Sequence, residues 1–124
     1  MARILVIDDD VQIQEMLKQM LERAGYEVVL APNGKVAIKI YSEEPADLII
    51  TDLIMPEMEG IETIRKFKRD FPDVAIIAMS GGGRIGPDSY LGMVKKFGVK
   101  YTFVKPIKRE DLLGAIREIL NQQT

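Results

Sequence analysis

Short runs of strand-forming residues alternate along the chain with longer stretches of helical period. Several of these short runs are apolar at successive positions, as expected for strands that helices cover on both faces. The alternation predicts repeated βα units around a parallel sheet. The predicted strands are Arg3–Ile7, Glu27–Ala31, Asp47–Thr51, Val74–Met79 and Tyr101–Val104.

Right-handed crossovers leave few ways to connect such units. We expect an α/β fold, namely a flavodoxin-like doubly wound parallel sheet of order 2-1-3-4-5 with five strands and five helices. The length of 124 residues, without an internal repeat or linker, predicts a single domain over residues 1–124. Ligands bind such sheets beyond the carboxyl ends of the strands, so the residues that end the strands are the candidate functional residues.

Local signals mark several helices. Asn33 in "PNGK" predicts an N-terminal cap, and Gly25 predicts the end of the first helix. We expect the fourth helix to follow "GGGRIGPDS" and to use Tyr90, Leu91, Val94 and Phe97. The apolar stripe of the first helix is predicted to contain Ile13, Met16, Leu17, Met20, Leu21 and Ala24, and that of the second Val36, Ala37, Ile40 and Tyr41.

Composition narrows the chemistry that the strand ends can perform. The chain has no cysteine and no histidine, which excludes thiolate and imidazole groups as ligands, nucleophiles or bases. Its formal charge is -2, from 17 basic and 19 acidic residues, so no overall field attracts nucleic acid or a membrane. No stretch is long and apolar enough for a membrane span, and we expect a cytoplasmic location.

Carboxylates directly follow the first and third predicted strands. "ILVIDDD" leads into Asp8, Asp9 and Asp10, and Asp52 follows Thr51. At about 4.5 Å and an effective dielectric near 20, each like-charged pair repels by roughly 3 to 4 kcal/mol. Asp10 is best explained as the cap of the next helix, but a cap does not require the other acids. Clustered carboxylates suit a hard cation such as Mg²⁺, which would offset the repulsion.

The fourth and fifth predicted strands lead into Ser80 and Lys105. In the expected strand order, the carboxyl ends of the strands lie along one edge of the sheet, which we call the rim. This hydroxyl and this ammonium group then lie on the same rim as the carboxylates. A lysine and a hydroxyl can hold phosphate oxygens beside a metal, and a carboxylate can itself accept a phosphoryl group. The rim therefore predicts phosphoryl-transfer chemistry.

Four segments together resemble the receiver domain of two-component response regulators, the group that includes the bacterial chemotaxis regulator. The segments are "ILVIDDD", "DLIITDLIMPEMEG", "AIIAMSG" and "FVKPI". The resemblance implies that Asp52 accepts a phosphoryl group from a sensor histidine kinase or a phosphotransfer protein in a Mg²⁺-dependent reaction. It also implies a metal site of Asp9, Asp52 and the backbone carbonyl of Ile54, with Asp8 acting largely through water.

The same resemblance implies roles for the remaining rim residues. Ser80 matches the switch hydroxyl that moves to the phosphoryl group, and Lys105 matches the lysine that pairs with it, followed by a cis bond to Pro106. Receivers usually carry an aromatic switch residue where this chain has Thr102. Our hypothesis is that the glycine-rich stretch after Ser80 moves in its place.

A receiver is a phosphoprotein switch, not an enzyme, and assists only its own phosphorylation and dephosphorylation. Phosphorylation is expected to reshape the surface of the fourth helix, fifth strand and fifth helix, for a downstream protein target or self-association. No direct nucleic-acid or membrane partner is expected. The surface would include Lys95, Lys96, Lys100, Tyr101 and Lys108.

Two alternatives stay open at this point. Asp8 and Asp10 also satisfy the DxD spacing of Mg²⁺-dependent phosphohydrolases of haloacid-dehalogenase type, although those enzymes are usually longer. A receiver-like interaction module that is never phosphorylated is the other, and the complete set of acid, hydroxyl and lysine argues against it.

Overall fold

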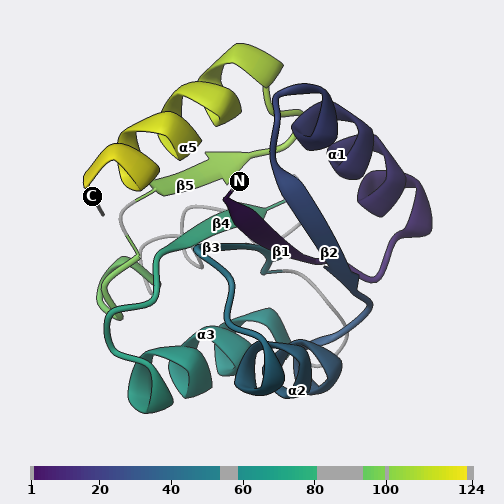
Figure 1. The fold of residues 1–124 in the computed structure, drawn as a ribbon. Helices are drawn as coiled ribbons and strands as arrows, with labels where there is room; N and C mark the ends of the chain where they lie inside the picture. Colours follow the sequence, from purple (N-terminus) through teal and green to yellow (C-terminus); the bar gives the residue numbers. More distant parts are fainter. Residues whose placement is uncertain (1, 54–58, 81–93, 100, 123–124) are drawn as a thin grey trace.

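The computed structural model describes residues 2–53, 59–80, 94–99 and 101–122. Five parallel strands form one sheet in the order β2-β1-β3-β4-β5, which confirms the predicted fold. The strands are β1 (Arg3–Ile7), β2 (Glu27–Ala31), β3 (Leu48–Asp52), β4 (Ile76–Ser80) and β5 (Tyr101–Val104). The helices are α1 (Val11–Arg23), α2 (Gly34–Glu43), α3 (Glu59–Asp70) and α5 (Arg109–Gln122). Helices α1 and α5 cover one face of the sheet, and α2 and α3 cover the other (Figure 1).

Successive residues of one strand pack on opposite faces of the sheet. In β1, Ile4 and Val6 pack with the buried residues of α1 and α5, whereas Leu5 and Ile7 pack with those of α2 and α3. All four are at most 1% exposed. Side chains of a strand point alternately to opposite faces, so two covered faces require apolar residues at successive positions.

The predicted bounds of β1, β2 and β5 are confirmed, and those of β3 and β4 are shifted toward the C-terminus. The backbone N–H of Val74 donates to the carbonyl of Phe71 at 3.0 Å, which places Val74 in the turn after α3. At the other end, Asp52 pairs with Met79 and Ser80 pairs with Val104. Asp52 and Ser80 are therefore the last residues of their strands instead of the first residues beyond them.

The predicted helix caps are confirmed. Asp10 caps α1, accepting from the N–H of Gln12 at 2.9 Å, and Asn33 caps α2, accepting from Val36 at 2.9 Å. Helix α1 ends in a Schellman motif: Gly25 has a φ of +97°, and the N–H of Tyr26 donates to the carbonyl of Leu21 at 3.1 Å. These caps fix where the chain leaves the sheet and returns to it.

Some predicted helix features differ from the structure. Met16, expected in the buried stripe, is 55% exposed, because the stripe facing the sheet is centred on Leu17 and Leu21 and successive helical residues are about 100° apart. Val36 is likewise 37% exposed, and Ala24, the C-terminal cap of α1, is also exposed. Of the residues predicted for the fourth helix, Tyr90 and Leu91 lie outside the described part, whereas Val94 is buried and Phe97 packs against the same core cluster. None of the helices in the described ranges is long and apolar enough to cross a membrane.

Candidate functional site

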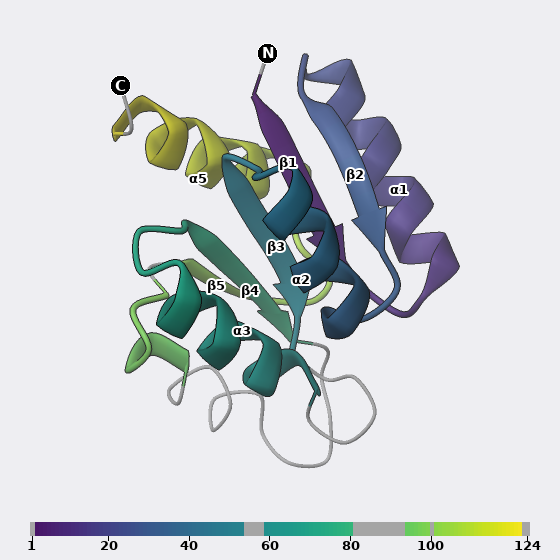
Figure 2. The ribbon, with the colours of Figure 1, turned by 60° about the horizontal axis from the view of Figure 1, so that its bottom comes forward.

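The carboxyl ends of the strands lie along one edge of the sheet (Figure 2). Asp8 follows β1, Asp52 ends β3, Ser80 ends β4 and Lys105 follows β5. Lys105 joins them: its Nζ lies 3.3 Å from Asp8 Oδ2 and 3.3 Å from Asp52 Oδ2, and its backbone N–H donates to the Ser80 carbonyl at 2.8 Å. The structure thus brings these four predicted site residues together.

Three of the predicted residues form a compact group of carboxylates. Asp8, Asp9 and Asp52 each offer an oxygen that lies within 4.8 Å of the other two. Two like charges at that distance repel by about 3.5 kcal/mol at an effective dielectric near 20, and opposite charges at 3.3 Å attract by about 5 kcal/mol. One ammonium group between Asp8 and Asp52 therefore offsets the repulsion between these two acids. Among the described residues, Lys105 forms ion pairs with Asp8 and Asp52 but not with Asp9.

Asp8 is fully buried, and protein groups contact each of its polar atoms. Its N–H donates to the Ala31 carbonyl at 3.2 Å, its Oδ1 accepts from the N–H of Asp10 at 2.9 Å, and Lys105 contacts its Oδ2. Its carbonyl accepts from the side-chain amide of Gln14. Asp9, in contrast, is exposed and has no hydrogen bond or ion pair with any described residue.

Gln14 was missed by the sequence analysis. A glutamine in the second turn of an amphipathic helix usually points into solvent, and nothing in its spacing indicates that the side chain turns back to the strand end. Only the three-dimensional path of the chain between Asp8 and α1 brings the two groups together.

Helix α3 packs directly on the end of β3. A Cβ added at Gly60 would lie 2.7 Å from Leu53 Cα and 2.8 Å from the Leu53 carbonyl oxygen, and would also collide with the Asp52 carbonyl. Gly60 thus permits a backbone approach that no side chain would allow. The candidate phospho-acceptor is held between β4, through the ladder pair with Met79, and the first turn of α3.

The peptide bond after Lys105 and the side-chain directions in β5 are as the sequence predicts. The bond between Lys105 and Pro106 is cis, as predicted. Tyr101 and Phe103 pack against the core under α1 and α5, and Thr102 between them points to the opposite face. A hydrogen bond to Glu118 raises the pKa of Tyr101 and ties this residue to α5.

Some predicted residues cannot be placed on this structure. Ile54 and Lys100 lie outside the described residues, as does the glycine-rich stretch 81–93. Of the predicted partner surface, Lys95, Lys96 and Lys108 are exposed.

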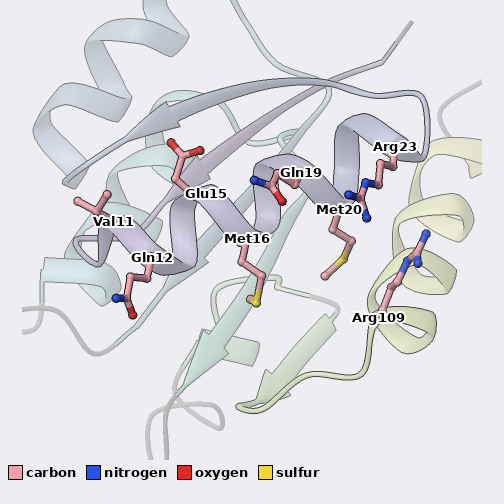
Figure 3. A pocket seen from close by; sticks show the side chains of 8 residues that line it. All are labelled: Val11, Gln12, Glu15, Met16, Gln19, Met20, Arg23 and Arg109. Atoms are coloured by element: carbon pink, nitrogen blue, oxygen red, sulfur yellow. The ribbon is translucent and has the colours of Figure 1, made fainter.

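Next to the rim, the outer side of α1 forms a groove of about 560 Å³ (Figure 3). Val11 and Met16, which are 66% and 55% exposed, supply apolar surface. Arg23 and Arg109 lie together at the end away from Val11. A smaller pocket of about 360 Å³ shares Met16 and Met20 with this groove and is also lined by Lys105.

Comparison with known proteins identifies the family. Residues 4–117 match the family described as the response regulator receiver domain. The chain belongs to this family. The receiver is 36% identical over 122 residues to "Response regulator receiver protein CpdR" of Brucella abortus. This alignment covers 97% of this chain and 98% of the relative.

Solved receiver structures match closely. A response regulator receiver domain protein from Clostridium thermocellum has a TM-score of 0.88 and 33% identity, covering 99% of this chain and 97% of that one. The response regulator TrrA from Thermotoga maritima, solved in complex with Mg²⁺-BeF, has a TM-score of 0.83 and 29% identity, covering 96% and 99%. Receiver domains are phosphorylation-dependent signalling switches, and the matches support this function and not the phosphohydrolase alternative.

Proposed function

We propose that Asp52 is the phospho-acceptor of this receiver, in a Mg²⁺-dependent transfer from a phosphohistidine. An Asp52 carboxylate oxygen forms a bond to phosphorus while the bond from phosphorus to the donor imidazole breaks, and the bonding electron pair stays with the imidazole nitrogen. The product is an acyl phosphate on Asp52. Because residues 1–124 contain no histidine, the donor imidazole lies outside them, on a sensor histidine kinase or a phosphotransfer protein.

The observation that carries this proposal is the placement of Asp52 against Lys105 within the group of three carboxylates. Asp8 is a poorer acceptor, because it is fully buried and protein groups contact both of its side-chain oxygens. Asp9 is exposed, but Lys105 does not contact it in the described structure. Among the three acids, Asp52 is the one that ends a strand and also contacts the lysine directly.

The carboxylate oxygens fit a hard divalent cation such as Mg²⁺. Asp9 and Asp52 would hold it directly, Asp8 through water, and the Ile54 carbonyl remains a predicted third protein ligand. When bound, Mg²⁺ neutralises charge on the transferring phosphoryl group and its oxygens. The relative TrrA, solved with Mg²⁺-BeF, supports this assignment.

Lys105 and Ser80 complete the proposed machinery. Lys105 already lies beside Asp52, so its ammonium group would pair with the phosphoryl oxygens after transfer. Ser80 ends the neighbouring strand β4 and would supply a hydroxyl to the same group. The receiver would assist its own phosphorylation and dephosphorylation but turn over no separate substrate.

We further propose that residues 1–124 form a single receiver domain, since one sheet unites the described strands. Phosphorylation would change the surface around β5 and α5, where a protein target or a second copy would bind. The groove along α1 would receive the phosphodonor, because it offers exposed apolar side chains and shares Met16 and Met20 with a pocket that Lys105 lines. The cytoplasmic location stays a prediction.

Intact mass after incubation with acetyl phosphate and Mg²⁺ tests the proposal. We expect one added phosphoryl group, which is absent in Asp52→Asn and in the presence of a chelator. Asp10→Asn is the matched control, because asparagine can still cap α1 and the acceptor carboxylate is unchanged. Phosphorylation that persists in Asp52→Asn, or repeated hydrolysis of a small phosphate ester by that variant, would contradict the proposal.

A further inference from the structure

Asp8, Asp9 and Asp10 join β1 to α1 and form an acidic loop. Besides the cap at Asp10, a side chain of α1 also contacts this loop. The side-chain amide of Gln14 donates to the carbonyl of Asp8, and the backbone N–H of Gln14 donates to the carbonyl of Asp10 at 3.0 Å. Gln14 is half-buried in the second turn of α1. One residue thus contacts the loop on both sides of Asp9.

The position of the contacted carbonyl is important. The Asp8 carbonyl belongs to the peptide group that joins Asp8 to Asp9, and the six atoms of a peptide group are coplanar. Holding its oxygen therefore restricts the positions of both Cα atoms, from which the two acidic side chains extend. In the described part of the chain, no other hydrogen bond reaches this carbonyl.

The two acids differ in how much they depend on this contact. The side chain of Asp8 is also held by Asp10 and Lys105. The exposed side chain of Asp9 has no such partner among the described residues. The position of the Asp9 Cα, and with it the placement of the Asp9 carboxylate near the other acids, therefore depends in part on the peptide group that Gln14 holds.

We infer that Gln14 is a positioning residue for the metal site, which orients the peptide group between Asp8 and Asp9 so that the Asp9 carboxylate faces a divalent cation. This inference rests on the proposed Mg²⁺ site. Outer groups that orient metal ligands typically change metal affinity by about 10- to 100-fold when they are removed. The effect here belongs near the lower limit, because Gln14 acts through the backbone.

Titration of the unphosphorylated protein with MgCl₂, followed by amide chemical shifts, measures this effect without any phosphotransfer. Gln14→Met keeps the length of the side chain and removes the donor. We expect its dissociation constant for Mg²⁺ to rise about tenfold. Gln14→Asn, whose amide is one methylene too short to reach the Asp8 carbonyl, should show the same rise. Gln12→Met, on the exposed side of the same helix, should bind Mg²⁺ like the wild type.

Thermal unfolding with and without Mg²⁺ separates positioning from general stability. A positioning role predicts that Mg²⁺ raises the melting temperature less in Gln14→Met than in the wild type, since ligand stabilisation follows affinity. If Gln14→Met lowers the melting temperature equally with and without Mg²⁺, and its dissociation constant stays within twofold of the wild type, the inference is wrong although the metal site stands. A wild type that binds no Mg²⁺ would overturn the metal site as well.

Discussion

The contact between α3 and the end of β3 makes one substitution especially informative. Alanine at Gly60 would place a methyl group 2.7 Å from Leu53 Cα and 2.8 Å from its carbonyl oxygen. Neither backbone atom can rotate aside as a side chain could, so α3 must move. Gly114 in α5 is the matched control, because a Cβ there meets only Arg117 Nη2, at 4.0 Å. The same chemical change should therefore have opposite effects at the two sites.

The expected magnitudes follow from packing and helix propensity. Overfilling a packed site costs about 1 to 3 kcal/mol, and alanine in place of glycine within a helix gains about 0.5 to 1 kcal/mol. We expect a net loss of about 1 to 2 kcal/mol for Gly60→Ala and a gain of about 0.5 to 1 kcal/mol for Gly114→Ala. At about 4 °C per kcal/mol for a domain of this size, the melting temperature should fall by about 4 to 8 °C and rise by about 2 to 4 °C, respectively.

Thermal unfolding by circular dichroism, without Mg²⁺, measures both changes. Because the collision at Gly60 includes the Asp52 carbonyl, Gly60→Ala should also slow phosphorylation by acetyl phosphate at temperatures where it remains folded. Gly114→Ala should leave that rate unchanged. A melting temperature for Gly60→Ala equal to or above that of the wild type would refute the close approach of α3 to β3.

Three further predictions concern other parts of the fold. Asp10→Ala removes the cap of α1 and should lower the free energy of unfolding by about 1 kcal/mol, whereas Asp10→Asn should be close to wild type in urea unfolding. Met16→Ala should slow phosphotransfer from the cognate kinase but not from acetyl phosphate, and equal slowing with both donors would contradict a docking role. Burial, together with the charge of Asp47, raises the pKa of Tyr41. The Tyr41 hydroxyl therefore loses its proton at a lower pH in the unfolded chain than in the folded protein, so the free energy of unfolding falls as pH rises above about 10. Urea unfolding of Tyr41→Phe should show a smaller fall over the same pH range.

Features that depend on local chemistry could be predicted from the sequence. The caps at Asp10 and Asn33 and the turn at Gly25 each require only a few neighbouring residues. The strands and their order follow from successive apolar residues and from the handedness of βα connections. The carboxylates, the hydroxyl and the lysine could be placed on one rim because parallel strands align their carboxyl ends.

Features that depend on contacts between distant segments could not be predicted in this way. Asp52 and Ser80 belong to their strands because the hydrogen-bonded ladder extends to them, which the pattern of either strand alone does not reveal. The approach of Gly60 to Leu53 depends on how α3 returns to the sheet. The contact from Gln14 to the Asp8 carbonyl likewise depends on a side chain turning back along its own helix.

The double covering of the sheet has a consequence for how receivers of this kind diversify. Every residue of β3 and β4 is buried, as are all but the first of β1, so these strands present almost no surface that a partner could read. A new signalling partner must therefore be recognised through other parts of the surface, such as the exposed helix positions Met16 and Lys95 or the outer strand β5. Mutations at such exposed positions can change which partner binds, while the residues at the strand ends stay the same.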